Sequence, residues 1–123
     1  MPTPAVVEEF ARTVEAGRYI EAIERYYAEG ASMRENGAEP RQGIAALVEN
    51  EKQVMARFGK ITASRLGPII VDGDRVAIPW AFDFALPNGA ALRLEEIAWQ
   101  RWDGDKVVEE RFFYDPRQLQ PAS

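Results

Sequence analysis

The chain has 123 residues, of which 46% are hydrophobic and 28% charged, the balance of a folded protein rather than a disordered one. Its net charge of -5 repels a phosphate backbone, so we expect no nucleic-acid partner. Cysteine and histidine are both absent, which excludes disulfides, thiol nucleophiles and the commonest metal ligand.

Acid–base chemistry in this chain must therefore rest on Asp, Glu, Lys, Tyr or bound water. The sequence contains no clustered acidic loop of the kind that binds Ca²⁺ or Mg²⁺, so we expect no metal and no cofactor. It contains no secretory leader and no apolar run of about 20 residues, so we expect no membrane partner and a cytoplasmic protein. The length predicts one domain over residues 1–123.

Helices are predicted in the first half of the chain. Thr3 is a good N-cap, Pro4 suits the first helical position, and Gly17 stops the helix. The other two predicted helices cover residues 18–29 and 44–58, and are followed by Gly30 and Gly59. Residues 31–36 are a candidate short strand, and residues 37–43 are predicted as loop.

The second half is rich in β-branched and aromatic residues, which favour strands. Asp-Gly or Asn-Gly pairs separate the runs and predict hairpin turns at Gly73, Gly89 and Gly104. The four predicted strands cover residues 60–71, 75–86, 90–102 and 106–115. Helices followed by strands indicate an α+β fold, with three helices packed on a curved antiparallel sheet. We expect the tail after Asp115 to be loosely held.

The pairing across Asn88-Gly89 decides which strand residues share a face. A two-residue turn there pairs Asp83 with Leu94 and Ala81 with Glu96. One face then carries small residues together with Asp83, Glu96, Gln100 and Trp102. The opposite face carries Trp80, Phe82, Phe84, Ile97 and Trp99. The first face suits a pocket wall with a few polar groups, or else a solvent-exposed surface. The second is a large aromatic patch that predicts a homodimer.

The third predicted helix carries Glu51 inside its apolar stripe. A buried carboxylate needs a partner or becomes protonated, so Glu51 is a candidate site residue. The alternatives are a structural ion pair or a position at the edge of the buried face. Arg34 is a suitable partner in each case.

The order of the elements resembles the NTF2-like fold and, within it, the SnoaL-like group. The resemblance rests on "EAGRYIEAIERYYAEGASM", "RQGIAALV" and "RWDGDKVVEERFFYDP", and it covers essentially the whole chain. It implies a cone-like α+β fold whose curved sheet surrounds a pocket. The family includes polyketide cyclases, ketosteroid isomerases, epoxide hydrolases, dehydratases and non-enzymatic modules. A pocket acid of ketosteroid isomerases aligns with Ala98 here, and the nearest carboxylate on that face is Glu96.

The last strand has two possible registers. A simple two-residue turn pairs Trp102 with Val107 and places Arg111, Phe113 and Asp115 on the pocket side. A bulge near the turn places Glu110, Phe112 and Tyr114 there instead. We favour the first arrangement, in which Arg111 lies diagonal to Glu96 and holds it ionised.

Two classes of function follow from this pattern. The first is a cofactor-independent enzyme that acts on a small apolar organic molecule, with Asp83, Glu96 or Glu51 as acid or base. The second is a non-catalytic ligand-binding or dimerisation module in which the same acids form structural ion pairs. The predicted ligand-binding residues are Tyr27, Arg34, Trp102, Arg111, Phe113 and Tyr114.

Overall fold

The computed structural model describes residues 1–120. Its helices are α1 (Pro4–Glu15), α2 (Tyr19–Tyr26), α3 (Ile44–Arg57) and a short 3₁₀ turn, η1 (Pro116–Leu119). Its strands are β1 (Tyr27–Glu35), β2 (Arg41–Gln42), β3 (Lys60–Arg65), β4 (Ile70–Asp72), β5 (Arg75–Ala85), β6 (Ala91–Asp103) and β7 (Lys106–Phe113). Over these residues, no helix has both the length and the apolar character required to cross a bilayer.

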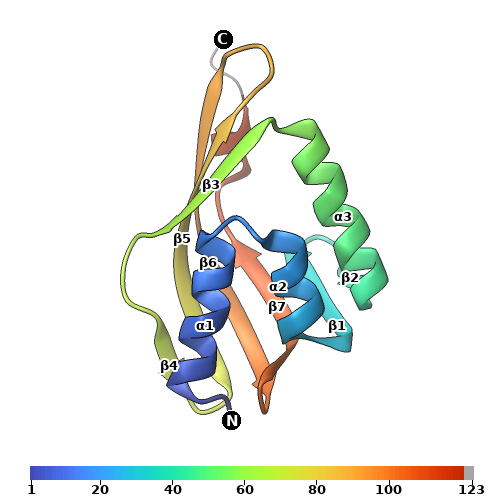
Figure 1. Ribbon diagram of the computed structural model, residues 1–123, viewed down its shortest axis with the longest axis vertical. Coiled ribbons are helices and arrows are strands. Elements are labelled where there is room, and N and C mark those ends of the chain that lie inside the picture. The colour runs from blue at the N-terminus through green and yellow to red at the C-terminus, as the bar shows by residue number, and fades with distance from the viewer. Residues whose placement is uncertain (121–123) are drawn as a thin grey trace.

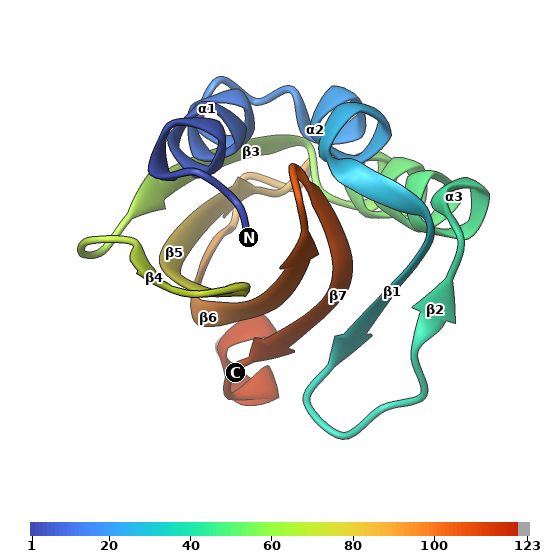
Figure 2. The same ribbon diagram turned by 90° about the horizontal axis from the view of Figure 1, so that it is seen from below.

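The strands form one strongly curved sheet, and the three α-helices lie across its concave side (Figures 1 and 2). The strand order is β2-β1-β7-β6-β5-β3, and β4 pairs with β5. The predicted α+β class with helices on a curved sheet is confirmed. The sheet is mixed rather than purely antiparallel, because β1 joins β7 in parallel. The predicted strand 60–71 is interrupted at Gly67-Pro68 and forms β3 and β4.

The predicted register of β5 and β6 is wrong by one residue. Asp83 pairs with Arg93, and Trp80 pairs with Glu96. The connection is a three-residue loop, Pro87 to Gly89, in which the Gly89 N–H donates to Leu86 O at 3.0 Å. Pro87 suits the second position of a type I turn, and Gly89 takes the positive φ of 88° that completes such a loop. Glu96 therefore shares the concave face with the aromatic residues of β5.

The favoured register of the last strand is also wrong in its upper part. Trp102 does pair with Val107, as predicted, but Arg101 then pairs with Glu109, so the strand carries one extra residue there. This bulge turns Glu110 and Phe112 towards the concave face, which is the alternative arrangement. Arg111 consequently lies on the convex face, opposite Trp99.

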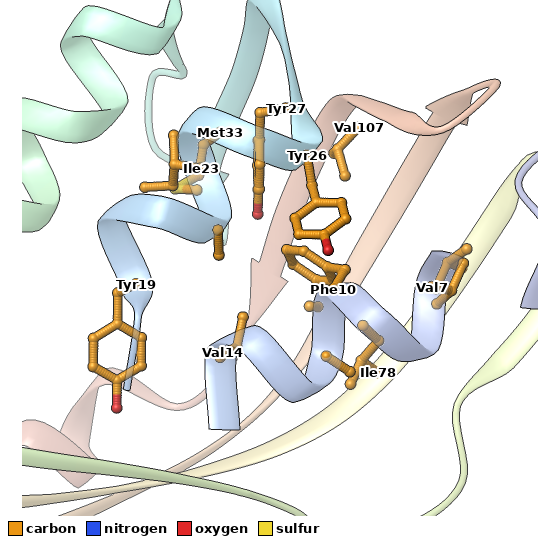
Figure 3. Close-up of a cluster of buried hydrophobic side chains, with 14 of the residues drawn as sticks. Val7, Phe10, Val14, Tyr19, Ile23, Tyr26, Tyr27, Met33, Ile78 and Val107 are labelled. Carbon is orange, nitrogen blue, oxygen red and sulfur yellow. The ribbon is translucent and has the colours of Figure 1, made fainter. Parts of the chain in front are cut away.

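The hydrophobic core fills the space between the helices and the lower part of the sheet (Figure 3). Phe10 of α1 lies at its centre, and its ring packs against those of Tyr26, Tyr27 and Trp102 at centroid distances of 5.6, 5.9 and 5.8 Å. Helix α2 ends at Tyr26 rather than at residue 29, because Tyr27 adopts an extended conformation and starts β1. This early exit carries the Tyr27 side chain into the core.

The segment after β7 is fastened to the sheet, contrary to the expectation of a loosely held tail. The side-chain oxygen of Gln118 accepts a hydrogen bond from the Glu95 N–H at 2.9 Å, and its side-chain nitrogen donates to Glu95 O at 3.0 Å. Beyond the end of β7, this side chain thus forms the hydrogen bonds to β6 that a neighbouring strand would otherwise form. Residues 121–123 of the predicted tail lie outside the described part of the chain.

We predict that Gly59→Ala destabilises the fold by about 1–3 kcal/mol, because the new methyl group would overpack a tight joint between α3 and β3. An added Cβ would lie 2.7 Å from Ala85 O, a backbone atom that cannot move alone. Urea unfolding measures the change. Gly30→Ala is the control, since nothing lies within 4 Å of its added Cβ. Equal stability of the two variants would contradict the prediction.

Candidate functional site

A cavity of about 370 Å³ lies between the sheet and helices α2 and α3. Its apolar wall combines aromatic and aliphatic side chains, and its polar residues come from both the sheet and α3. The aromatic lining residues are Tyr19, Phe58, Phe82, Phe84, Phe112 and Tyr114. The polar lining residues are Glu35, Arg41, Asn50, Glu51, Arg57 and Glu96. Concave sites with this mixture are typical of small-molecule pockets.

The aromatic wall is built by residues that the sheet register brings together. Phe58 follows α3 directly and packs on Phe84 of β5, with ring centroids 4.5 Å apart. Phe82 continues this row at 6.5 Å from Phe84. Tyr19 closes the row from α2, and its hydroxyl donates to Ile61 O at 3.1 Å. This hydrogen bond fixes the orientation of the hydroxyl at the edge of the cavity.

Glu96 is the most unusual side chain of the cavity. It is only 8% exposed, and within residues 1–120 it forms neither a hydrogen bond nor an ion pair. Burial raises its pKa to about 8, and the negative charges of Glu110, Glu35 and Glu51 contribute. In most molecules at neutral pH, Glu96 is therefore protonated. A protonated carboxyl can donate a proton to a ligand, and its carboxylate form can accept one.

Glu51 reaches the cavity from α3. Burial raises its pKa, while the charge of Arg41 opposes that shift. Arg41 extends from β2 and pairs with Glu35 at 3.4 Å, and its Nε–H is buried without a hydrogen-bond partner in residues 1–120. Among these described residues, no group of acidic side chains is arranged to hold a metal ion.

A hydrogen-bonded network lies behind the cavity, in the core. Glu110 is 2% exposed and accepts hydrogen bonds from the hydroxyl of Tyr27 and, at 2.6 Å, from the amide of Gln100. The indole N–H of Trp102 donates to Gln100 at 2.9 Å. Burial raises the pKa of Glu110 to about 7, although the two hydrogen bonds oppose the rise. All polar groups of this network are partnered, which is typical of a structural arrangement.

The predicted site residues fall into three groups. The cavity is lined by Glu51, Glu96 and Tyr114, as predicted. Tyr27 and Trp102 lie in the buried network with Glu110 instead of in the cavity wall. The others are absent from the cavity lining. These are Asp83, Arg34, Arg111 and Phe113.

The placement of Asp83 on the pocket wall is wrong, because the one-residue register shift turns it to the convex face. There its carboxylate pairs with Arg93 at 3.2 Å. The bulge in β7 likewise turns Arg111 and Phe113 outwards, where Phe113 is 43% exposed. Arg34 shares this outer face, since it pairs with Arg111 across the parallel strands. None of these four residues is placed to touch a ligand in the cavity.

Sequence reasoning missed Arg41, Glu35 and the aromatic pair Phe58 and Phe84 as cavity residues. Arg41 lies in a segment predicted as loop, and no local pattern indicated that it would pair with Glu35. Phe84 was assigned to the convex face by the wrong register. Glu110 was present only in the alternative reading of the last strand.

The SnoaL-like domain family matches residues 7–110 of the chain. No curated protein sequence matches the chain significantly. The family match covers most of α1, all of α2 and α3, and most of the sheet, including Glu51 and Glu96.

Solved structures with this fold are numerous. A protein of unknown function with a cystatin-like fold from Xanthomonas campestris is 22% identical, with a TM-score of 0.81 over 97% of this chain and 95% of that chain. TerC, co-crystallised with polyporic acid, is 16% identical, with a TM-score of 0.79 over 94% and 92%. A protein from Catenulispora acidiphila with a ketosteroid isomerase-like fold, in complex with trimethylamine, is 13% identical, with a TM-score of 0.80 over 95% and 90%. At these identities the likeness establishes the fold.

We predict that the free energy of unfolding falls between about pH 5 and pH 8 and levels off above. Glu96 and Glu110 have folded-state pKa values of about 8 and about 7, above the ordinary 4.5, so the folded state holds protons that the unfolded chain has lost. Each group contributes a slope of up to about 1.4 kcal/mol per pH unit. The chain has no histidine to obscure this window.

Urea unfolding at a series of pH values measures the effect. Glu96→Gln should reduce the slope and raise the stability at pH 9. Glu95→Gln, which changes the exposed neighbour on the convex face, should leave the slope unchanged. A slope that is the same in both variants and the natural chain would show that Glu96 ionises normally in the fold.

Proposed function

From the premise that the chain belongs to the SnoaL-like domain family, we propose that it binds a small, largely apolar organic molecule in the cavity and exchanges a proton with it through Glu96. The volume of about 370 Å³ is at the lower end of the range for organic-ligand sites. The polar groups that the cavity offers are carboxyls, guanidinium groups, phenols and the amide of Asn50. The proposed reaction class is therefore cofactor-independent isomerisation, cyclisation or hydrolysis.

One observation carries this proposal: Glu96 is a buried carboxyl that has no partner within residues 1–120 and faces a cavity lined by aromatic and aliphatic side chains. A pKa of about 8 places its titration near neutral pH, where one group can both accept and return a proton. The surrounding apolar side chains lower the local dielectric and would strengthen its interaction with a bound molecule.

Charge that develops on the substrate would be stabilised by Arg41 and Tyr114. Arg41 lines the cavity, and its guanidinium group would place positive charge near an oxygen of the ligand. Burial and the charge of Glu35 raise the pKa of Tyr114 to about 12, so its hydroxyl stays protonated and can donate.

The alternative is a non-catalytic ligand-binding module whose acids form structural ion pairs. This account fits Asp83, which pairs with Arg93, and Glu110, whose hydrogen bonds are satisfied. It does not explain Glu96, which has no structural partner among the described residues and faces the cavity. The acid–base proposal is therefore the better supported.

Two proteins with the same fold were crystallised with an organic acid and an organic amine, respectively. These molecules support a role of this chain in binding small organic compounds. They differ in charge, so the ligand chemistry of this protein must be inferred from its own side chains.

We predict that the protein accelerates the exchange of carbon-bound hydrogen in 2-tetralone, an apolar ketone with acidic C–H bonds, for deuterium from D₂O. Glu96→Gln should lower the enzymatic rate by about 100-fold or more, since a positioned acid–base group contributes about that factor. Proton NMR measures the loss of the C–H signal, with Glu95→Gln as the control. Equal exchange by Glu96→Gln and the natural protein would remove Glu96 from the proposed chemistry.

We also propose that the chain forms a homodimer, through the convex face of the sheet. The predicted aromatic contact is wrong in part, because Trp80, Phe82 and Phe84 lie on the concave side. The convex face instead presents a smaller patch around the sheet centre. Its exposed members are Ile97, Trp99 and Phe113, at 42%, 41% and 43% exposure.

The charges around this convex patch suit a second copy of the chain. Arg34 and Arg111 lie side by side at one corner, and neither forms an ion pair among the described residues. Asp83 and Glu95 lie beyond the opposite corner, where both pair with Arg93, and this group of three carries one net negative charge. A two-fold axis through the patch would bring the positive corner of each copy towards the negative corner of the other.

We predict that Trp99→Glu converts this dimer to a monomer at micromolar concentration without lowering stability by more than about 0.5 kcal/mol, because the side chain is already partly exposed in one chain. Sedimentation equilibrium measures the mass. Leu66→Glu is the control, since Leu66 is 48% exposed and lies outside the convex patch. A monomeric natural protein would overturn the dimer proposal.

A further inference from the structure

The cavity lining contains more acidic than basic side chains. Three carboxyl groups, those of Glu35, Glu51 and Glu96, line it, and Arg41 is the guanidinium that pairs with one of them. Arg57 also borders the cavity, but it is exposed and lies over the ring of Phe58 at 5.2 Å. Within residues 1–120, Glu51 and Glu96 therefore have no cation bonded to them. The charge that the site lacks is positive.

Glu96 is the acid in this cavity for which a missing partner matters most. It is more than nine-tenths buried, it has no hydrogen-bond partner in the described residues, and it contributes to the cavity wall. An anionic ligand would face Glu35, Glu51 and Glu96 and would be repelled by every one that is ionised. A neutral ligand could accept a hydrogen bond from protonated Glu96, but it would supply no counter-charge to a carboxyl that is ionised. A cation would compensate them and would allow Glu96 to ionise.

The remaining wall also suits a cation. Phe58, Phe82 and Phe84 form a continuous aromatic row, and Phe112 and Tyr114 add two further rings. Ring faces carry negative partial charge and attract organic ammonium groups, most strongly where water is excluded. Aromatic rings together with carboxylates provide both of the interactions that such groups need.

We propose that the ligand is a small organic cation, with a tertiary or quaternary ammonium group held between Glu51, Glu96 and the aromatic row. This inference rests on the proposed function, because it assumes that the cavity binds a ligand. It adds that the ligand is positively charged. When the cation enters, Glu96 loses its proton to solvent and becomes a carboxylate. The ligand thereby converts the acid into a base at the moment when it is needed.

The pH dependence of binding follows from this step and from the groups that surround Glu96. Those groups come from every element packed against the cavity: Tyr19 of α2, Glu35 of β1, Arg41 of β2, Glu51 and Arg57 of α3, Glu110 of β7, and Tyr114. Because one proton leaves for each cation bound, the affinity should rise by up to about tenfold per pH unit and level off above about pH 8.

The experiment compares choline with 3,3-dimethylbutan-1-ol, its neutral carbon isostere, and with 3,3-dimethylbutanoate, an anion of similar shape. Chemical-shift titration of the ¹⁵N-labelled protein at pH 6, 7, 8 and 9 measures the affinities and identifies the residues contacted. We expect choline to bind at pH 8 at least about tenfold more tightly than the alcohol or the anion. Calorimetry in phosphate and in Tris should show release of up to one proton per choline bound.

Glu96→Gln should weaken choline binding by about tenfold or more and abolish both the proton release and the pH dependence, with little effect on the alcohol. Glu24→Gln, a change at an exposed position of α2 outside the cavity lining and the convex patch, should bind as the natural protein does. If the alcohol binds in the cavity as tightly as choline, the cation inference is overturned and the pocket function stands. If none of the three compounds binds, the cation inference is also overturned, and the exchange of 2-tetralone decides the proposed function separately.

Discussion

The pairing of β5 with β6 is the constraint on which the site depends. The three-residue loop from Pro87 to Gly89 sets it, and strands alternate faces, so this loop length decides the direction of every side chain in both strands. With this register, Glu96 faces the helices in the company of Trp80 and Phe82. A change of one residue would turn β5 over relative to β6, so that Asp83 would share the face of Glu96 and the aromatic row would lie on the opposite face.

The bulge in β7 adds a second buried carboxyl beside the first. It turns Glu110 inwards next to Gln100, and the negative charge of Glu110 helps to raise the pKa of Glu96. The core satisfies Glu110 through Tyr27 and Gln100 but provides nothing for Glu96 among the described residues. The two acids are therefore neighbours with different roles: Glu110 belongs to the core, and Glu96 belongs to the cavity.

Local sequence signals predicted the elements well, because caps, glycine stops and turn residues act within a few positions. The N-cap at Thr3, the helix end before Phe58 and the hairpin turns at Gly73 and Gly104 are of this kind. The register of β5 was not predictable in this way, since Asn88-Gly89 fits both a two-residue and a three-residue loop. The bulge in β7 was likewise undetermined, because it is selected by burial of Glu110 and Phe112 against other elements.

The same limits explain the outcome at the candidate site. Glu51 could be found because a polar residue interrupts an apolar helical stripe, which is a local pattern. Glu96 was placed on the cavity wall although the predicted register was wrong. The error assigned the wrong face of β5 to the cavity and left the assignment of β6 unchanged. Asp83 was lost for the same reason. Arg41 could not be found, since its approach to the cavity depends on the short pairing of β2 with β1.

A carboxyl at position 96 without a partner in residues 1–120 makes the folded protein less stable than it could be. Its neighbours on the same face of β6, Leu94 and Ala98, show that apolar side chains fit this wall. Burying a carboxyl without a partner costs several kcal/mol in its charged form, and the raised pKa of Glu96 shows that the fold avoids that form by retaining the proton. A bound molecule that supplies a charge or a hydrogen bond would recover part of this loss, and the recovered energy would appear as affinity. The stability that the fold loses at Glu96 and the affinity of the cavity for a ligand therefore have the same cause, which is a carboxyl that the fold leaves without a partner.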